Sequence, residues 1–253
     1  MDLGLRDRVY VVTGGSRGLG RAAAGVLVAE GARVVLSGRD EVAAAKAAEE
    51  LGGGDQAVGV GADNADPNAA ERLVAAAVAR YGRIDGAMIS VGGPPPGSIL
   101  DTDDEEWRES FETVYLGALR IARAVVAAGS SGTSIAFVLS TSVKQPVDGL
   151  AISNGLRPGL AMAAKTLADE VGPHGIRVNG LLPGRIGTDR VRELDAASGD
   201  ADAARAAQEA RIPLRRYGEP EEFGRVAAFV LSPAASYLTG TMIVVDGGVT
   251  RAL

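Results

Sequence analysis

The stretch that decides the fold of this chain is VYVVTGGSRGLG, which runs from Val9 to Gly20. Its four apolar residues predict a short buried strand, and the Ala-rich segment Gly20–Glu30 that follows has the spacing of an amphipathic helix. The glycines between them allow a tight turn and a close approach of the backbone to a ligand. Free N–H groups at the start of a helix attract anions, so the unit predicts a cradle for the pyrophosphate of a dinucleotide.

The same alternation of strand and helix continues to the end of the chain. Between further β-branched runs lie segments with helical spacing, such as Trp107–Ala128. Strands that are apolar on both faces and alternate with helices are typical of a covered parallel sheet. We predict an α/β protein: a single Rossmann-like, doubly wound domain over residues 1–253, with about seven parallel strands and helices on both faces. The predicted strands are Val9–Val12, Arg33–Ser37, Ala57–Gly61, Ile84–Ser90, Ser134–Ser140, Ile176–Leu182 and Met242–Val245.

Composition excludes several classes of protein. The 253 residues include no cysteine and one histidine, which excludes disulfide scaffolds, Cys-based zinc sites and thiol catalysis. The formal charge of −6 argues against a nucleic-acid or membrane partner. No apolar run reaches the ~18 residues of a membrane span, and the charged start MDLGLRDRV lacks the apolar centre of a signal peptide. We expect a soluble cytoplasmic protein whose partner is a small-molecule substrate.

The end of the second predicted strand distinguishes between two dinucleotides. An acidic residue there binds the ribose hydroxyls of NAD, whereas an arginine suits the 2′-phosphate of NADP. Gly38 occupies the position expected for the acid and Arg39 follows it, with Arg17 as a second guanidinium for the phosphate. We therefore expect NADP(H). NAD is the second choice, and applies if Asp40 binds the ribose and Arg39 lies in solvent.

These motifs resemble those of the short-chain dehydrogenase/reductase family, in particular its 3-oxoacyl-ACP reductase-like members, over nearly the whole chain. Thr13–Gly20 is similar to the family's T-G-x-x-x-G-x-G loop, and Arg177–Asn179 with Pro183–Gly184 is similar to its R-V-N…P-G segment. Tyr237–Gly240 and Val245–Gly248 resemble its C-terminal strand signature. The resemblance and the residues above imply cofactor binding by Gly14, Ser16, Arg17, Gly18, Leu19, Gly20, Arg39, Asp63, Asn64, Gly92, Arg157, Pro183, Gly184, Ile186 and Thr188.

The catalytic positions depart from the family pattern. Ser153 and Arg157 stand in place of its Tyr-x-x-x-Lys pair, and Tyr115 stands at the position of its active-site Asn. The family's serine corresponds to Ser142 by the local pattern, or to Ser140 by its distance from Ser153. The serine hydroxyls can donate to an oxyanion, and the Arg157 guanidinium can donate to the nicotinamide ribose. Neither kind of group is an acid comparable with a phenol.

The proton donor therefore stays open. Tyr115 is the first candidate, because its predicted helix borders the catalytic strand; simple packing is the other interpretation of this residue. Lys144, acting through water, is a further candidate. Family members that reduce conjugated double bonds also lack the tyrosine, so we expect NADP(H)-dependent reduction of a carbonyl or an activated enone. The alternative is a non-catalytic sensor or partner subunit that binds the dinucleotide and has lost the acid.

Two further features are interpreted as structural. The acidic run Asp101–Glu106 suggests a metal site, but Thr102 and Glu105 fit a helix capping box, so we expect no metal. His174, in a Gly-Pro-His-Gly turn, is expected at the surface.

Two segments bear on the substrate and on assembly. Residues 188–215 contain few large apolar residues and predict a lid on the substrate side or a plain surface insertion. The predicted helix Leu156–Val171 offers a face of small residues to a second copy of the chain. Together with the family resemblance, it predicts a homotetramer, with a homodimer as second choice.

Overall fold

A parallel sheet forms the centre of the molecule. The structure, a computed structural model, describes residues 2–197 and 199–252. Within them seven strands pair in the order β3-β2-β1-β4-β5-β6-β7, and every pair is parallel. The order reverses beside β1, where doubly wound sheets bind their ligands. The strands are β1 (Val9–Val12), β2 (Arg33–Gly38), β3 (Ala57–Gly61), β4 (Gly86–Ile89), β5 (Ser134–Val138), β6 (Arg177–Pro183) and β7 (Met242–Val245).

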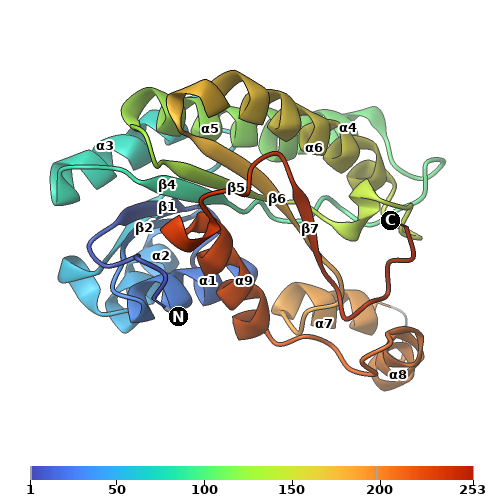
Figure 1. The fold of residues 1–253 in the computed structure, drawn as a ribbon. Coiled ribbons are helices and arrows are strands. Elements are labelled where there is room, and N and C mark those ends of the chain that lie inside the picture. The colour runs from blue at the N-terminus through green and yellow to red at the C-terminus, as the bar shows by residue number, and fades with distance from the viewer. Residues whose placement is uncertain (1, 198, 253) are drawn as a thin grey trace.

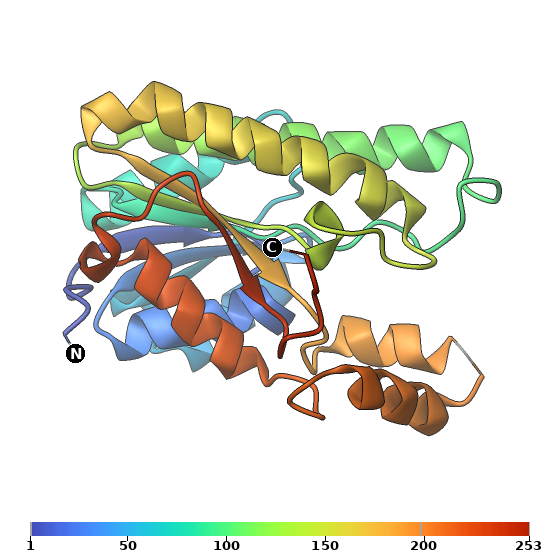
Figure 2. The same cartoon turned by 45° about the vertical axis from the view of Figure 1, so that its right-hand side comes forward.

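Helices cover both faces of this sheet, as predicted. In Figures 1 and 2, α3, α5 and α6 lie on one side of the sheet and α1, α2 and α9 on the other. The helices on the first side are α3 (Ala69–Tyr81), α4 (Asp104–Ser110), α5 (Gly117–Ala128) and α6 (Ala151–Val171). Those on the second side are α1 (Gly18–Ala29), α2 (Glu41–Glu50) and α9 (Pro220–Leu231), and α7 (Asp189–Ala196) and α8 (Ala201–Arg211) stand beside the sheet.

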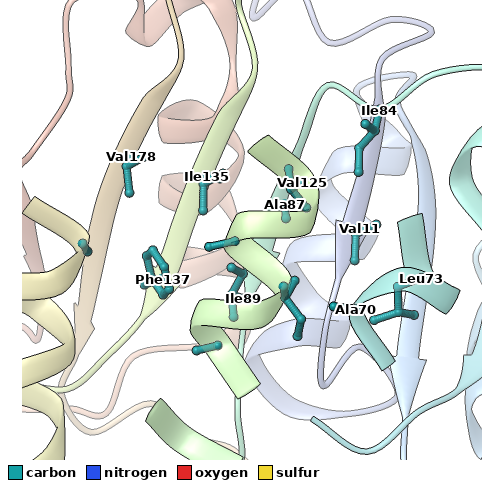
Figure 3. Close-up of a cluster of buried hydrophobic side chains, with 14 of the residues drawn as sticks. Val11, Ala70, Leu73, Ile84, Ala87, Ile89, Val125, Ile135, Phe137 and Val178 are labelled. Carbon is teal, nitrogen blue, oxygen red and sulfur yellow. The ribbon is translucent and has the colours of Figure 1, made fainter. Parts of the chain in front are cut away.

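Each strand contributes to two cores, because successive side chains of a strand point to opposite faces. Val9 and Val11 of β1 pack under α3 and α5, whereas Tyr10 and Val12 pack under α1 and α9. Figure 3 shows the first of these cores, in which Phe137 and Val178 continue the apolar layer from the neighbouring strands. Burial of both faces explains why the strands read as unbroken apolar runs in the sequence.

Tertiary contacts move two helix boundaries. The predicted helix Trp107–Ala128 is interrupted by a π-helical segment, Phe111–Leu116. There Gly117 packs so closely on the loop after β3 that a Cβ would lie 2.3 Å from the Asn64 carbonyl oxygen. Helix α6 begins at Ala151, five residues before the predicted start, because the Ala151 N–H is bonded to the Gly97 carbonyl oxygen at 3.1 Å.

The capping box at the start of α4 uses a different pair of residues from the predicted one. Asp103 accepts from the Glu106 N–H, and the Glu106 carboxylate accepts from the Asp103 N–H. Thr102 is not the cap, since its hydroxyl donates to the Ser98 carbonyl oxygen and fixes the preceding turn. His174 is exposed in a 3-10 turn, as expected.

Candidate active site

The glycine-rich turn joins β1 to α1 at the carboxyl edge of the sheet. Gly14 has a positive φ of 59°, and a Cβ there would lie 2.9 Å from the Ser90 carbonyl oxygen. A Cβ at Gly20 would lie 2.2 Å from the Gly14 carbonyl oxygen. No side chain caps the start of α1, so its first N–H groups stay available to an anion. The turn therefore fits the pyrophosphate of a dinucleotide.

The end of β2 fits a 2′-phosphate better than a free ribose. A Cβ at Gly38 would lie 2.8 Å from Ser16 Oγ, so any side chain at this position would have to displace the Ser16 hydroxyl. Asp40 caps α2, since its carboxylate accepts from the N–H groups of Val42 and Ala43 at 2.9 and 3.1 Å. Both bonds are to Oδ1, so the helix orients this exposed carboxylate through one of its two oxygens. Arg39 and Arg17 are both exposed at this corner and can reach a phosphate.

The remaining cofactor positions surround the same edge of the sheet. Asp63 follows β3, and its carboxylate accepts from the Ala65 N–H at 3.0 Å. The segment Pro183–Thr188 follows β6, and Ile186 forms a parallel bridge with Gly218. The methyl group of Thr188 lies 3.7 Å from the position a Cβ would take at Gly18, so this segment faces the glycine-rich turn directly. Gly92 follows β4 and is exposed.

The two serine candidates after β5 have different roles. Ser140 caps the 3-10 turn Thr141–Val143, because its hydroxyl accepts from the Ser142 N–H at 3.1 Å. The hydroxyl oxygen of Ser142 lies 3.2 Å from that of Ser153, and both residues are buried. The structure thus brings Ser142 and Ser153 together and leaves Ser140 as a cap.

Arg157 lies one turn after Ser153 on the same face of α6. It is buried, and one of its N–H groups donates to the Val138 carbonyl oxygen at 2.8 Å, at the end of β5. Burial lowers the pKa of Arg157 to about 10, so the side chain is still charged at neutral pH. The same helix face therefore carries Ser153 and, one turn later, a buried guanidinium that is bonded to the end of β5.

Tyr115 is not joined to this group. Its ring stacks on Phe111, with ring centroids 5.1 Å apart, and contacts Gly159 of α6. Gly159 is two residues beyond Arg157, and so points about 200° away from it around the helix axis. Among the described residues no hydrogen bond links any tyrosine to Ser142, Ser153 or Arg157. The other tyrosine hydroxyls donate elsewhere or lie in solvent: Tyr10 to Leu231, Tyr81 to Gly54, Tyr217 to Asp195, with Tyr237 fully exposed.

Two positioning contacts were not predicted from the sequence. The Asn154 side chain holds the loop between Ser142 and Ser153 in place. It accepts from the Val147 N–H at 3.0 Å and donates to the Val147 carbonyl oxygen at 2.9 Å. Arg190 of α7 donates to the Pro94 carbonyl oxygen at 2.9 Å and so connects the predicted lid to the loop after β4. Both side chains bind backbone groups, seven residues away for Asn154 and 96 for Arg190, and no motif marks such a contact.

Neither a membrane-spanning helix nor a metal site is found in the part of the chain that the structure describes. No helix in residues 2–197 or 199–252 combines the length and the apolar character needed to cross a membrane. In the same residues no group of three or more acidic or histidine side chains gathers to hold a metal ion.

Known proteins match this chain along almost its entire length. The model of a family described as Enoyl-(Acyl carrier protein) reductase matches residues 14–250. L-rhamnose 1-dehydrogenase (NAD(P)(+)) from Azotobacter vinelandii is 38% identical, over 96% of this chain and 97% of its own. The 3-oxoacyl-[acyl-carrier-protein] reductase FabG of Salmonella typhimurium is 31% identical, over 97% of this chain and 98% of its own.

Solved structures of other proteins share this fold over the whole chain. L-sorbose reductase from Gluconobacter frateurii, complexed with NADPH and L-sorbose, superposes with a TM-score of 0.92 at 30% identity, covering both chains completely. A Brucella melitensis protein described as a short-chain dehydrogenase/reductase gives a TM-score of 0.93 at 29% identity, again over both whole chains. Because the family model and these relatives cover the cofactor edge and the serine helix alike, the chain belongs to the short-chain dehydrogenase/reductase family of oxidoreductases.

Proposed function

We propose that this protein is an NADP(H)-dependent oxidoreductase that reduces a carbonyl group or an activated enone. In this proposal Ser142, Ser153 and Arg157 replace the family's Tyr-x-x-x-Lys pair. The observation that carries it is the buried pair of hydroxyls, 3.2 Å apart, beside a buried guanidinium. The relatives named above are sugar dehydrogenases and reductases or an acyl-carrier reductase, which supports a hydroxylated or acyl carbonyl compound as the substrate class.

The cofactor, when bound, supplies the hydride. The glycine-rich turn and the start of α1 hold its pyrophosphate, while Arg17 and Arg39 hold the 2′-phosphate. Asp63 and Asn64 lie on the adenine side, and Pro183–Thr188 lies on the nicotinamide side. Arg157 has further N–H groups beyond the one on Val138 and can donate them to the nicotinamide ribose. The preference for NADP(H) rests on Arg39 and Arg17 and on the lack of a carboxylate at Gly38, while Asp40 is oriented by its cap of α2.

The serine pair binds the substrate oxygen. Each hydroxyl has one hydrogen, and only one of the two is needed for the bond between them. Ser142 Oγ also donates to the Ser153 carbonyl oxygen at 3.4 Å, and this hydrogen can turn from that carbonyl to a substrate carbonyl or enolate oxygen as negative charge develops there. Arg157, one turn away on α6, stabilises the same negative charge, because its own positive charge is buried and weakly screened by water. This arrangement orients the substrate and stabilises its anion without being an acid.

The proton must then come from water. Serine hydroxyls do not approach the acidity of a phenol, whose pKa is about 10, and an arginine does not release its proton at neutral pH. Lys144, exposed on the loop next to Ser142, can relay a proton from water. Substrates that form a delocalised anion need less immediate protonation. α-Diketones, quinones and conjugated enones are therefore better substrates than simple ketones.

NADPH oxidation across a panel of such acceptors tests this proposal. We expect the parent protein to reduce activated acceptors, and Ser142→Ala to lose about 10²–10³-fold in turnover with unchanged NADPH affinity. Ser140→Ala removes only the cap of the adjacent turn and should lose less than tenfold. Tyr115→Phe should have little effect, because its ring lies against Gly159. If the parent and Ser142→Ala were equally inert on every acceptor while binding NADPH, the reductase proposal would be abandoned.

A dinucleotide sensor or non-catalytic partner subunit is the second candidate. The observation that favours it is that the described tyrosines all lie away from the serine pair. This candidate predicts tight NADPH binding, no turnover with any acceptor, and a second protein whose binding depends on the NADPH/NADP ratio.

A further inference from the structure

The charge of Arg157 has no acidic partner. The residue is 5% exposed, and burial is the only influence on its pKa, so no carboxylate among the described residues acts on it. Its one hydrogen bond is to a neutral carbonyl oxygen, that of Val138. Buried charges in proteins are normally paired, because a lone buried charge forfeits its hydration without compensation. Residues 2–197 and 199–252 therefore leave this cation without a compensating charge.

The unused N–H groups of Arg157 are open to a ligand. A guanidinium has five N–H donors, and one of them is bonded to Val138. Only Ser37 Oγ and Thr250 Oγ1 are fully buried polar side-chain atoms without a partner in the described residues. The unbonded nitrogens of Arg157 are not among them, so solvent reaches these nitrogens although the residue as a whole is buried. Such a donor lies at the inner end of an accessible site.

The neighbouring groups are donors as well. Ser153 lies one turn before Arg157 on the same face of α6, and its hydroxyl pairs with that of Ser142. A ligand held by two hydroxyls and a guanidinium must offer several acceptor atoms. A neutral ligand would leave the buried charge uncompensated, whereas an anion would compensate it. A carboxylate fits the planar edge of a guanidinium with two parallel hydrogen bonds.

We infer that Arg157 binds the carboxylate of the substrate, and that the substrate is an oxo acid whose carbonyl oxygen lies on Ser142 and Ser153. This inference rests on the proposed function for the reaction and for the cofactor. Arg157 has four N–H groups beyond the one on Val138, so two can serve the nicotinamide ribose and two the carboxylate. It also gives a reason for arginine in place of the family's lysine. An ammonium is a point charge, whereas a guanidinium can bond the Val138 carbonyl and still present a planar edge to a carboxylate.

Direct binding tests the inference without turnover. Oxamate and oxamide have nearly the same size and shape and differ in the carboxylate. Each is titrated by calorimetry into protein saturated with NADPH. We expect oxamate to bind at least tenfold more tightly than oxamide. Arg157→Met should remove this preference and Arg157→Lys should retain part of it. Arg108→Met, at an exposed arginine of α4, should leave it unchanged.

Turnover gives an independent measurement. Pyruvate is compared with methyl pyruvate and 2,3-butanedione, which are neutral compounds of similar shape. We expect kcat/KM to favour pyruvate at least tenfold in the parent, through KM more than kcat, and Arg157→Met to abolish that preference. Equal reduction of all three, with oxamate binding no better than oxamide, would overturn the inference and leave the oxidoreductase intact.

The two proposals can fail separately. If no acceptor were reduced but oxamate bound through Arg157, the carboxylate site would stand and the proposed reaction would be wrong. If Arg157→Met did not fold, the comparison of oxamate with oxamide on the parent protein would still test the carboxylate site, because it needs no variant. Equal and weak binding of both compounds to the parent would then refute the carboxylate site.

Discussion

Single atoms at the end of β2 decide how this chain distinguishes its dinucleotides. The space beyond Gly38 is filled by Ser16, and the carboxylate of Asp40 is held by the first N–H groups of α2. An N-cap of this kind contributes about 1 kcal/mol to stability, which a ribose contact would have to replace. Arg39 is left as the exposed side chain at the strand end. We propose that the preference for NADP(H) follows from Arg39 together with the lack of an acid at Gly38.

Reversing the charge at Arg39 tests this explanation. Arg39→Glu should weaken NADPH binding by roughly 1.5–3 kcal/mol, the scale of a hydrogen bond to a charged group, and should flatten or reverse the preference over NADH. Fluorescence titration with each cofactor provides the measurement. Asp40→Ala is the matched control, and should lower the unfolding free energy by about 1 kcal/mol while leaving cofactor preference unchanged. Equal affinity of the parent for both cofactors would contradict the explanation.

Among the secondary-structure elements, α7 and α8 form a unit held by one buried carboxylate. Asp195 accepts from Arg185 at 2.9 Å and from the Tyr217 hydroxyl at 3.0 Å, and Arg205 of α8 lies over the Tyr217 ring. Burial and the bond to Asp195 raise the pKa of Tyr217 to about 12, so this donor keeps its proton at physiological pH. Arg185 belongs to the segment that faces the glycine-rich turn. The predicted lid is therefore tied directly to the segment that we propose lies beside the nicotinamide.

Removal of this carboxylate should loosen the lid as a whole. Asp195→Ala leaves the Tyr217 hydroxyl and Arg185 without their acceptor, so the unfolding free energy should fall by roughly 1–3 kcal/mol. Hydrogen exchange of α7 and α8 amides should quicken together, while the strands of the sheet keep their protection. Asp202→Ala, on an exposed position of α8, is the control and should change neither. Unchanged exchange in α7 would show that the two helices are held by other contacts.

For the whole molecule, the outer face of α6 is the place where we expect copies of the chain to meet. Met162 on this face is 64% exposed, and Phe111, beside Tyr115 at the edge of the same surface, is 39% exposed. Gly155 and Gly159 of α6 make room for Trp107 and Tyr115 of the same chain, so these two rings form the border of the surface around Met162. Apolar side chains in this arrangement lose contact with water when the copies pair. We predict a homotetramer, or else a homodimer, that uses α6.

A charge on that face should break the assembly. Met162→Glu should convert the tetramer into smaller species in light scattering at micromolar concentration, because the carboxylates of two copies would be buried against each other. Val42→Glu is the matched control: Val42 is 78% exposed on α2, away from α6, and its replacement should leave the mass unchanged. A parent protein that is monomeric at this concentration would contradict the prediction.

The sequence by itself determined the architecture, the glycine-rich turn and the basic corner at Arg39. These features depend on local patterns: buried strands are continuous apolar runs, and a turn beside a phosphate needs glycine at fixed spacing. The family resemblance also predicted that Ser153 and Arg157 share one helix, and both lie on α6. The tertiary structure decided what depends on distant backbone atoms. In the structure Ser142 pairs with Ser153 while Ser140 caps a turn. The Tyr115 ring lies against Gly159, and Asp40 caps α2. Hydrogen bonds and close contacts between residues far apart along the chain carry no periodic signal, and so they become visible only when the elements are packed.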